Sequence, residues 1–283
     1  MSLSKIAKKH LGQNFLTNPR IIDRIVNTAD IRPDDTVLEI GPGLGALTKM
    51  IIPTGVMFFA IEKDPQMVVK LQESIPNNNL HLIQHDILTY DFSALPALTK
   101  IIGNIPYNIS TQIVEKLIAV RHQCPRAFLT VQLDFAERLA AEPGNKDYGA
   151  LTCFIQYYAD VKILFNIAAS AFKPRPKVTS AFISIQFREP MLKATDEKLL
   201  FQITRTVFNQ RRKKMINPLS GLFRRELLEN IFERLGIPKN IRGEDLELRK
   251  FVEIANLVNE KTTCSSLKTN DGSSHRDGSQ KRN

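Results

Sequence analysis

The segment TVLEIGPGLGALT, residues 36–48, joins an apolar run to three closely spaced glycines and the start of a helical pattern. Its first five residues have the β-branched and apolar composition of a buried parallel strand. Leu44, Leu47 and Ile51 then recur at the spacing of one helix face. The chain must turn sharply between these two patterns, which predicts a strand–loop–helix unit.

The three glycines indicate a site where a ligand approaches the backbone. Gly41, Gly43 and Gly45 lack a Cβ atom, so they permit positive φ angles and close contact. Backbone N–H groups at the start of the following helix can face an adenosyl ligand. Gly41, Gly43 and Ala46 also fit the GxGxxG/A pattern of dinucleotide-binding proteins, so a nicotinamide or flavin oxidoreductase remains open at this point.

Two later apolar runs end in acidic residues that suit an adenosine. The run 56–61 stops at Glu62, about twenty residues after the first glycine, where a carboxylate reaches a ribose in either class of enzyme. The run 80–84 is followed by Asp86, which can accept a hydrogen bond from an adenine amine, and by Ile87, which can pack against the ring. Glu62 and Asp86 are therefore predicted to bind the cofactor.

The next run, residues 100–103, ends at NIPY, residues 104–107. This tetrapeptide resembles the Asn/Asp-x-Pro-Tyr/Phe motif of the amino-methyltransferases, which follows the fourth strand of a sheet that binds S-adenosylmethionine. The resemblance implies that the Asn104 side-chain oxygen and the Ile105 carbonyl accept hydrogen bonds from a target amine. Pro106 would fix the turn and Tyr107 would stack on the base, while Asn104 would also touch the cofactor.

Six segments, NIPY included, occur in the order of one family: KxxGQNF (9–15), EIGPGLGALT (39–48), NIPYNIST (104–111), YGAL (148–151), SAFKPRPKVTSA (170–181) and FNQRRK (208–213). From about Lys5 to about Ala255 the chain is similar to small-subunit ribosomal RNA adenine dimethyltransferases of the KsgA type. The resemblance implies a Rossmann-like α/β methyltransferase sheet with a small C-terminal all-helical domain. It also implies dimethylation of two adjacent adenines in a hairpin loop of small-subunit ribosomal RNA, linked to ribosome biogenesis.

The family also assigns roles to the N-terminal segment. The resemblance implies that Asn14 and the Leu16 backbone touch the cofactor, with Gly41 and Gly43 on the other side. The preceding lysines, Lys8 and Lys9, would reach RNA phosphate. Composition alone describes the same basic segment as a solvated terminus.

Phe172 lies in a segment with neither helical nor strand periodicity, next to Pro174 and Pro176, which restrict it to an extended loop. A loop aromatic can plug the rim of a core. The family resemblance implies instead that Phe172 is exposed and stacks on the extruded adenine opposite Tyr107. Arg175 stands where the family more usually has a third proline.

Apolar strands alternate with amphipathic segments up to about residue 187, including expected late strands at 127–133, 161–165 and 181–187. Three parts are predicted: a catalytic domain that binds S-adenosylmethionine (1–188), a helical RNA-binding domain (189–259) and a disordered tail (260–283). The tail is rich in Ser, Thr, Asn, Gly and charge.

The chain carries 39 Lys and Arg against 29 Asp and Glu, a net charge of +10 that should attract a polyanion. Four successive cations, Arg211, Arg212, Lys213 and Lys214, would spread around the circumference of a helix. They are either a solvated face or a grip on RNA phosphates. We expect the second role.

Three cysteines without a CxxC pattern indicate free thiols in a reducing compartment. With no apolar run near eighteen residues and no signal-peptide pattern, we expect a cytoplasmic protein without membrane contact. The basic, acid-free N-terminus leaves import into an organelle as an alternative. No His/Cys cluster suggests a metal, and we expect a monomer acting on a small-subunit particle.

Three other functions remain open. A methyltransferase of large-subunit ribosomal RNA that confers antibiotic resistance shares the GQNF, glycine and NxPY/F elements, although FNQRRK and SAFKPRPKV favour the small-subunit family. A ribosome-assembly or transcription factor could keep the fold without needing catalysis. A Rossmann oxidoreductase would bind NAD rather than S-adenosylmethionine.

Overall fold

The computed structural model describes residues 7–8, 11–75 and 79–270, with side chains described up to residue 262. The chain divides into two compact units: Met1–Ala141 with Phe154–Pro190, and Glu142–Cys153 with Met191–Asn283. The inclusion of Glu142–Cys153 in the second unit differs from the predicted 1–188 domain. Within that unit, Tyr148 is buried, donates a hydrogen bond to the Leu246 carbonyl at 3.2 Å and packs edge-on against Phe208.

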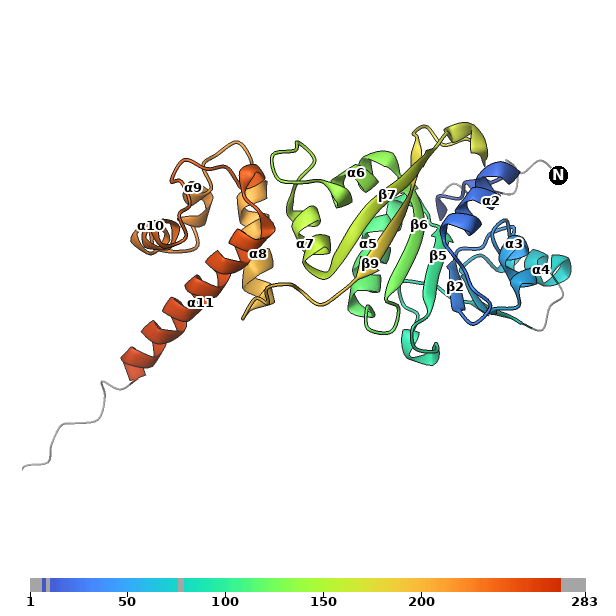
Figure 1. Ribbon diagram of the computed structural model, residues 1–283, viewed down its shortest axis with the longest axis horizontal. Helices are drawn as coiled ribbons and strands as arrows, with labels where there is room; N and C mark the ends of the chain where they lie inside the picture. Colours follow the sequence, from blue (N-terminus) through green and yellow to red (C-terminus); the bar gives the residue numbers. More distant parts are fainter. Residues whose placement is uncertain (1–6, 9–10, 76–78, 271–283) are drawn as a thin grey trace, which may run out of the picture. The chain divides into compact units, whose positions relative to one another are not determined.

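In the described residues, seven strands of the first unit form one sheet in the order β4-β3-β2-β5-β6-β9-β7. Figure 1 shows β2, β5, β6, β9 and β7 side by side. The strands are β2 (Thr36–Ile40), β3 (Met57–Glu62), β4 (Leu80–Gln84), β5 (Lys100–Asn104), β6 (Arg126–Gln132), β7 (Ala159–Ile167) and β9 (Ser180–Phe187). Neighbouring strands from β4 to β6 pair in parallel, and β9 is antiparallel to both β6 and β7. The expected α/β methyltransferase sheet is confirmed.

Helices connect these strands and cover the sheet. They are α2 (Pro19–Thr28), α3 (Thr48–Ile51), α4 (Pro65–Ser74), α5 (Ser110–Ala119), α6 (Leu133–Ala140) and α7 (Ala150–Tyr158), with short 3-10 turns η2 (Ile52–Thr54), η3 (Phe92–Ala94), η4 (Tyr107–Ile109) and η5 (Ala169–Ala171). Asn18 begins α2 because its side chain accepts hydrogen bonds from two backbone N–H groups, and Pro19 suits the first helical position. The helix predicted after the glycines is shorter than expected, since residues 43–47 form turns before Thr48.

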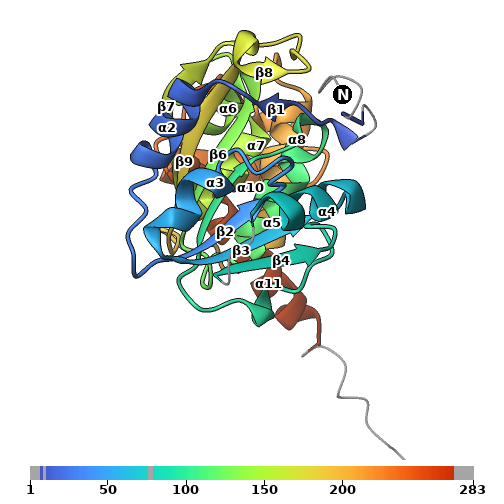
Figure 2. The same cartoon turned by 90° about the vertical axis from the view of Figure 1, so that its right-hand side faces the viewer.

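The short strands β1 (Phe15–Leu16) and β8 (Phe172–Lys173) pair antiparallel, with Leu16 opposite Phe172 (Figure 2). Phe172 is only 1% exposed and belongs to the apolar core that also contains Leu16 and Phe182. The prediction that Phe172 is an exposed loop residue is therefore wrong. β8 has only two residues, so the sequence contains too little alternation of apolar and polar residues to predict it.

The second unit is helical in its described part: α8 (Glu197–Asn209), α9 (Ile216–Leu219), α10 (Arg225–Arg234), η6 (Gly243–Asp245) and α11 (Leu248–Asn270). Asp196 caps α8 by accepting a hydrogen bond from the Leu199 backbone N–H. The predicted tail started too early, because α11 continues through residues 260–270. The remainder of the tail, 271–283, lies outside the described residues.

Candidate functional site

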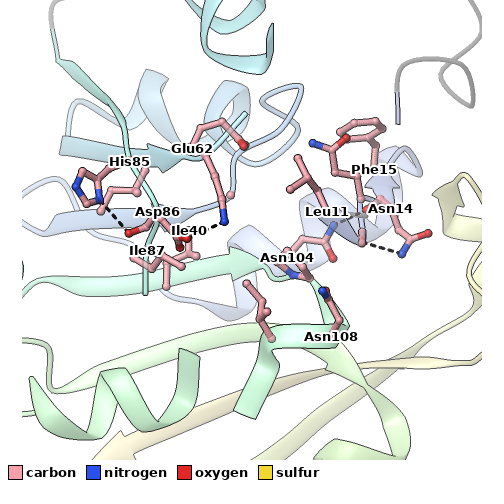
Figure 3. A pocket seen from close by; sticks show the side chains of 17 residues that line it. Leu11, Asn14, Phe15, Ile40, Glu62, His85, Asp86, Ile87, Asn104 and Asn108 are labelled. Carbon is pink, nitrogen blue, oxygen red and sulfur yellow. Dashed lines mark hydrogen bonds and ion pairs between the residues drawn. The ribbon is translucent and has the colours of Figure 1, made fainter. Parts of the chain in front are cut away.

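A pocket of about 150 Å³ opens where β2, β3, β4 and β5 end, at the carboxyl edge of the sheet. Ligands bind at this edge in open parallel sheets. Figure 3 shows the carboxylates of Glu62 and Asp86 on one side and the amides of Asn14, Asn104 and Asn108 on the other. Ile40, Ile61, Ile87 and Ile109 supply apolar wall. The pocket thus has one acidic end, one amide end and apolar side chains in its wall.

Glu62, at the end of β3, is fixed by two backbone groups. One carboxylate oxygen accepts from the Gly43 N–H at 3.0 Å and the other from the Asp64 N–H at 2.8 Å. Burial raises the pKa of Glu62, and the two backbone hydrogen bonds oppose that shift. Each oxygen keeps a second lone pair, so a pair of ribose hydroxyls can donate to a carboxylate that is already oriented.

Asp86, after β4, is held at the same end of the pocket. Its carboxylate accepts from Lys63 Nζ at 2.7 Å and from the Leu88 N–H at 3.0 Å. The hydrogen bond from Lys63 holds the pKa of Asp86 below its ordinary value, although partial burial opposes it. Asp86 is therefore an ionised acceptor beside Ile87, as an adenine amine requires.

Gly41 and Gly43 have different roles in the glycine turn. Gly41 has φ +65° and lines the pocket, with open space where a Cβ would stand. Gly43 has φ +57°, but a Cβ there would lie 3.1 Å from the Phe15 ring, and its N–H is used by Glu62. Gly43 does not line the described pockets. It orients Glu62, whereas Gly41 faces the ligand space.

The N-terminal segment is attached to the start of α4 through Asp64. Lys8 Nζ lies 2.8 Å from one Asp64 oxygen, and the Gln13 amide donates to the other at 3.1 Å. Burial raises the pKa of Asp64, but the hydrogen bonds from Lys8, Gln13 and the Gln66 N–H, together with the charge of Lys8, lower it overall. Lys8 is thus engaged within the protein, not free for phosphate as predicted, and Lys9 lies outside the described residues. Leu11, Gly12, Gln13 and Asn14 consequently form one wall of the pocket.

A hydrogen bond fixes the orientation of the side-chain amide of Asn104, at the end of β5. Its side-chain amide donates to the Asn14 backbone carbonyl at 2.8 Å, which leaves the Oδ1 atom directed elsewhere. In the described part of the chain, neither Asn104 Oδ1 nor the Ile105 carbonyl accepts a hydrogen bond. The protein uses neither of these adjacent acceptors; Asn104 and Pro106 line the pocket, and Ile105 between them is buried.

Tyr107 is half-buried, and its hydroxyl hydrogen-bonds to the Ser180 hydroxyl at the start of β9. Burial raises the pKa of Tyr107, so the phenol stays neutral. A second pocket of about 360 Å³ is lined by Gly12, Asn14, Tyr107, Asn108 and Gln132. It shares Gly12, Asn14 and Asn108 with the first pocket. Gln132 was not predicted as a site residue, because it ends a strand but belongs to no motif.

A third pocket of about 300 Å³ contains Leu16, Gly41 and Asn104 together with Glu39. Leu16 thus lines this neighbouring space and not the first pocket. Glu39 is 2% exposed and accepts a hydrogen bond from the Thr48 hydroxyl at 2.6 Å. Burial raises the pKa of Glu39 to about 8, so this carboxyl is largely protonated at neutral pH.

The predicted cation cluster does not form a helix. Residues 210–213 make a turn after α8, and Lys214 forms a bridge with Arg242. Arg211 is ion-paired, with Nε 2.6 Å from a Glu244 oxygen, and it also donates to the Asn145 carbonyl. Arg212, Lys213 and Lys214 are exposed. Arg211 is therefore a structural contact of the second unit, and three cations remain on the turn.

None of the helices in the described residues is long and apolar enough to cross a membrane. No group of three or more His, Cys, Asp or Glu side chains in that part of the chain is placed to hold a metal ion.

Comparison with known proteins identifies a family match over most of the chain. The family model described as ribosomal RNA adenine dimethylase matches residues 4–260. A ribosomal RNA small subunit methyltransferase A from Clostridium botulinum (strain Kyoto / Type A2) is 38% identical over 256 residues, which cover 88% of this chain and 93% of the relative.

Two solved structures share the fold over nearly the same length. A dimethyladenosine transferase from Plasmodium falciparum has a TM-score of 0.77 and 27% identity, covering 88% of this chain and 98% of its own. The 23S rRNA methyltransferase ErmE has a TM-score of 0.70 and 25% identity, covering 87% of this chain and 100% of its own.

Proposed function

The chain belongs to the ribosomal RNA adenine dimethylase family, and from this premise we propose that it dimethylates the exocyclic amines of adenines in small-subunit ribosomal RNA. The small-subunit choice rests on 38% identity to small-subunit enzymes, against 25% to the large-subunit enzyme ErmE. The single observation that carries the chemistry is the pair of unused acceptors on Asn104, which lines the first pocket, and on Ile105, which follows it in the chain.

We propose S-adenosylmethionine as the cofactor, since the first pocket fits its parts. Ile40, Ile61 and Ile87 offer apolar surface for an adenine ring, Glu62 can accept from the ribose hydroxyls, and Asp86 from the adenine amine. The cofactor supplies an electrophilic methyl group. The second pocket shares residues of the amide end with the first and can hold an acceptor base beside the cofactor. This arrangement favours a methyltransferase over a nicotinamide oxidoreductase.

The protein's contribution to methyl transfer is mainly orientation. The lone pair of an adenine amine is delocalised into the ring, so the amine is a weak nucleophile. If Asn104 Oδ1 and the Ile105 carbonyl each accept one N–H, they favour a pyramidal nitrogen whose lone pair points away from both acceptors. Alkylation makes the nitrogen acidic, so its proton can leave without a strong general base.

Tyr107 lines the second pocket, which we propose as the site of an adenine that has left its stack. The hydrogen bond to Ser180 fixes the ring for stacking. Phe172 is not part of this proposal, because its ring is buried in the core. The first methylation leaves one N–H on the amine, so one of the two acceptors suffices to orient it for the second methylation.

RNA outside the pocket would be bound by cations of both units, with Arg212, Lys213 and Lys214 as the proposed contacts of the second. Ribosomal RNA as substrate would place the activity in the cytoplasm, on a precursor of the small subunit. The monomeric state remains a prediction.

The test is transfer of tritiated methyl groups from S-adenosylmethionine to purified small and large ribosomal subunits that lack their dimethyladenosines. We expect label in the small subunit, on N6 of adenine. Protein carrying Asn104→Ala should transfer label far more slowly, which controls for contaminating enzymes. Label confined to the large subunit would refute the small-subunit assignment.

A further inference from the structure

We infer that Lys173, Arg175 and Lys177 form a phosphate-binding edge beside the proposed adenine pocket, where they hold the RNA backbone that flanks the target nucleotide. This inference rests on the proposed function and adds a substrate contact to it. The segment KPRPK, residues 173–177, connects β8 to the stretch that precedes β9. We call it the KPRPK loop.

Side chains in the KPRPK loop alternate in exposure. Lys173, Arg175 and Lys177 are exposed, whereas Pro174 and Pro176 between them are half-buried. The two prolines cannot donate backbone hydrogen bonds and have a fixed φ, so they restrict the backbone that carries the cations. Three positive charges are therefore directed to solvent from a short and restricted segment.

The three cations have no counter-charge within the described part of the chain, where none of them forms an ion pair or a side-chain hydrogen bond. Elsewhere in the first unit, cations such as Lys63, Lys100 and Arg188 are paired with carboxylates at 2.6–2.9 Å. Three unpaired charges within five residues repel one another, and an external polyanion relieves that repulsion.

Both ends of the KPRPK loop are attached to the site. At one end, Lys173 lies opposite Phe15 in the β1–β8 pair, and Phe15 lines the first pocket. At the other end, the Thr179 carbonyl accepts from the Leu133 N–H at 3.0 Å, and Ser180 holds the Tyr107 hydroxyl. The loop is thus anchored beside Phe15 of the first pocket on one side, and on the other it leads to Ser180, the hydrogen-bond partner of Tyr107.

This placement suits the RNA backbone on either side of an extruded base. A nucleotide that enters the second pocket brings its neighbouring phosphates to the rim. Contacts to phosphate fix position and register without reading sequence. Arg175 would add a planar, bidentate phosphate donor, which a proline at the same place could not supply.

The test compares two triple variants that remove the same charge from the first unit. One is Lys173→Gln, Arg175→Gln and Lys177→Gln. The control is Lys70→Gln, Lys116→Gln and Lys162→Gln, on α4, α5 and β7. Binding to protein-free ribosomal RNA from unmethylated small subunits is measured over a range of salt concentrations. Each lost phosphate contact should reduce the log–log slope by about 0.7–0.9, so the loop variant should lose about 2–3 in slope.

We expect the control to keep the wild-type slope, and the loop variant to keep wild-type affinity for S-adenosylmethionine and to methylate with a raised KM. Equal slopes in the loop variant and the wild type would overturn the inference, as would an equal loss in the control. A loss seen only with intact particles would also overturn it, because the partner would then be a ribosomal protein. Wild-type protein that binds RNA but transfers no label would refute the proposed function alone, since the slope still decides the loop contact.

Discussion

Glu39 combines a buried carboxyl with a hydroxyl donor from Thr48, and burial raises its pKa to about 8. An acid whose pKa is higher in the folded than in the unfolded chain stabilises the fold fully below its unfolded value near 4.5. That stabilisation is lost as pH rises through about 8, at up to about 1.4 kcal/mol per pH unit. We predict that Glu39→Gln flattens the pH dependence of the unfolding free energy between pH 5 and 8, measured by denaturant titration.

The matched control for Glu39 is Glu73→Gln, at an exposed position of α4. It should leave the wild-type slope unchanged. Glu62, whose pKa is also raised by burial, is present in both variants. Parallel curves for Glu39→Gln and wild type would show that Glu39 is ionised in the folded protein.

Substitutions of Phe172 distinguish a role in core packing from a role in stacking on the target adenine. Because its ring is buried among Leu16, Phe165 and Phe182, Phe172→Ala should cost about 3–5 kcal/mol of unfolding free energy. Phe172→Leu keeps the apolar volume but removes the aromatic face. We therefore expect Phe172→Leu to retain most of the methyl-transfer rate per folded molecule. A stable Phe172→Leu protein with severely reduced transfer would restore the stacking role.

Among the site residues, those that end an apolar strand were predictable from the sequence. Glu62, Asp86 and Asn104 each follow such a run, and parallel strands bring their ends to one edge. The partners that orient them were not predictable. The Gly43 N–H on Glu62 and the Asn14 carbonyl under Asn104 depend on distances between segments that are remote in sequence.

At the scale of elements, the N-terminal segment is held by its contacts to Asp64, the residue that caps α4. Lys8→Met removes the ion pair and leaves the cap intact. The lysine is 29% exposed, so we assign the contact about 1 kcal/mol. Because the same segment forms a wall of the cofactor pocket, S-adenosylmethionine should dissociate about fivefold faster, measured by stopped flow.

The control for Lys8→Met is Lys100→Met, which breaks a comparable ion pair with Asp35 at 2.6 Å. Lys100 begins β5, at the edge of the sheet away from the pocket. Its loss should affect stability without changing the dissociation rate. An unchanged rate in Lys8→Met would show that the ion pair does not hold the pocket wall.

Strands were predicted well where the apolar pattern extends over several residues, as in β4 and β9. Short elements were not. β8 has two residues and exists because β1 pairs with it, and the turn after α8 interrupts what looked like a helical run of cations. In both places, pairing between distant segments decided the local structure.

At the scale of the whole molecule, the residues of the cofactor pocket all belong to the first unit, between Leu11 and Ile109. The exposed cations Arg212, Lys213 and Lys214 belong to the second. The organisation therefore separates the proposed cofactor site from part of the proposed RNA contact. A chain that ends at Pro190 should retain S-adenosylmethionine affinity within about threefold of the full chain.

Such a truncated chain keeps residues 142–153 but loses their partners. Tyr148 would be left without Leu246 and Phe208, and an unpaired apolar surface promotes association. We predict opposite effects of Tyr148→Gln in two contexts. In the full chain it should lower the melting temperature, because a buried ring and its hydrogen bond are lost. In the chain ending at Pro190 it should raise the monomer fraction measured by light scattering. If Tyr148→Gln destabilises both forms, Tyr148 packs against the first unit, and the division of the chain at residues 142–153 is wrong.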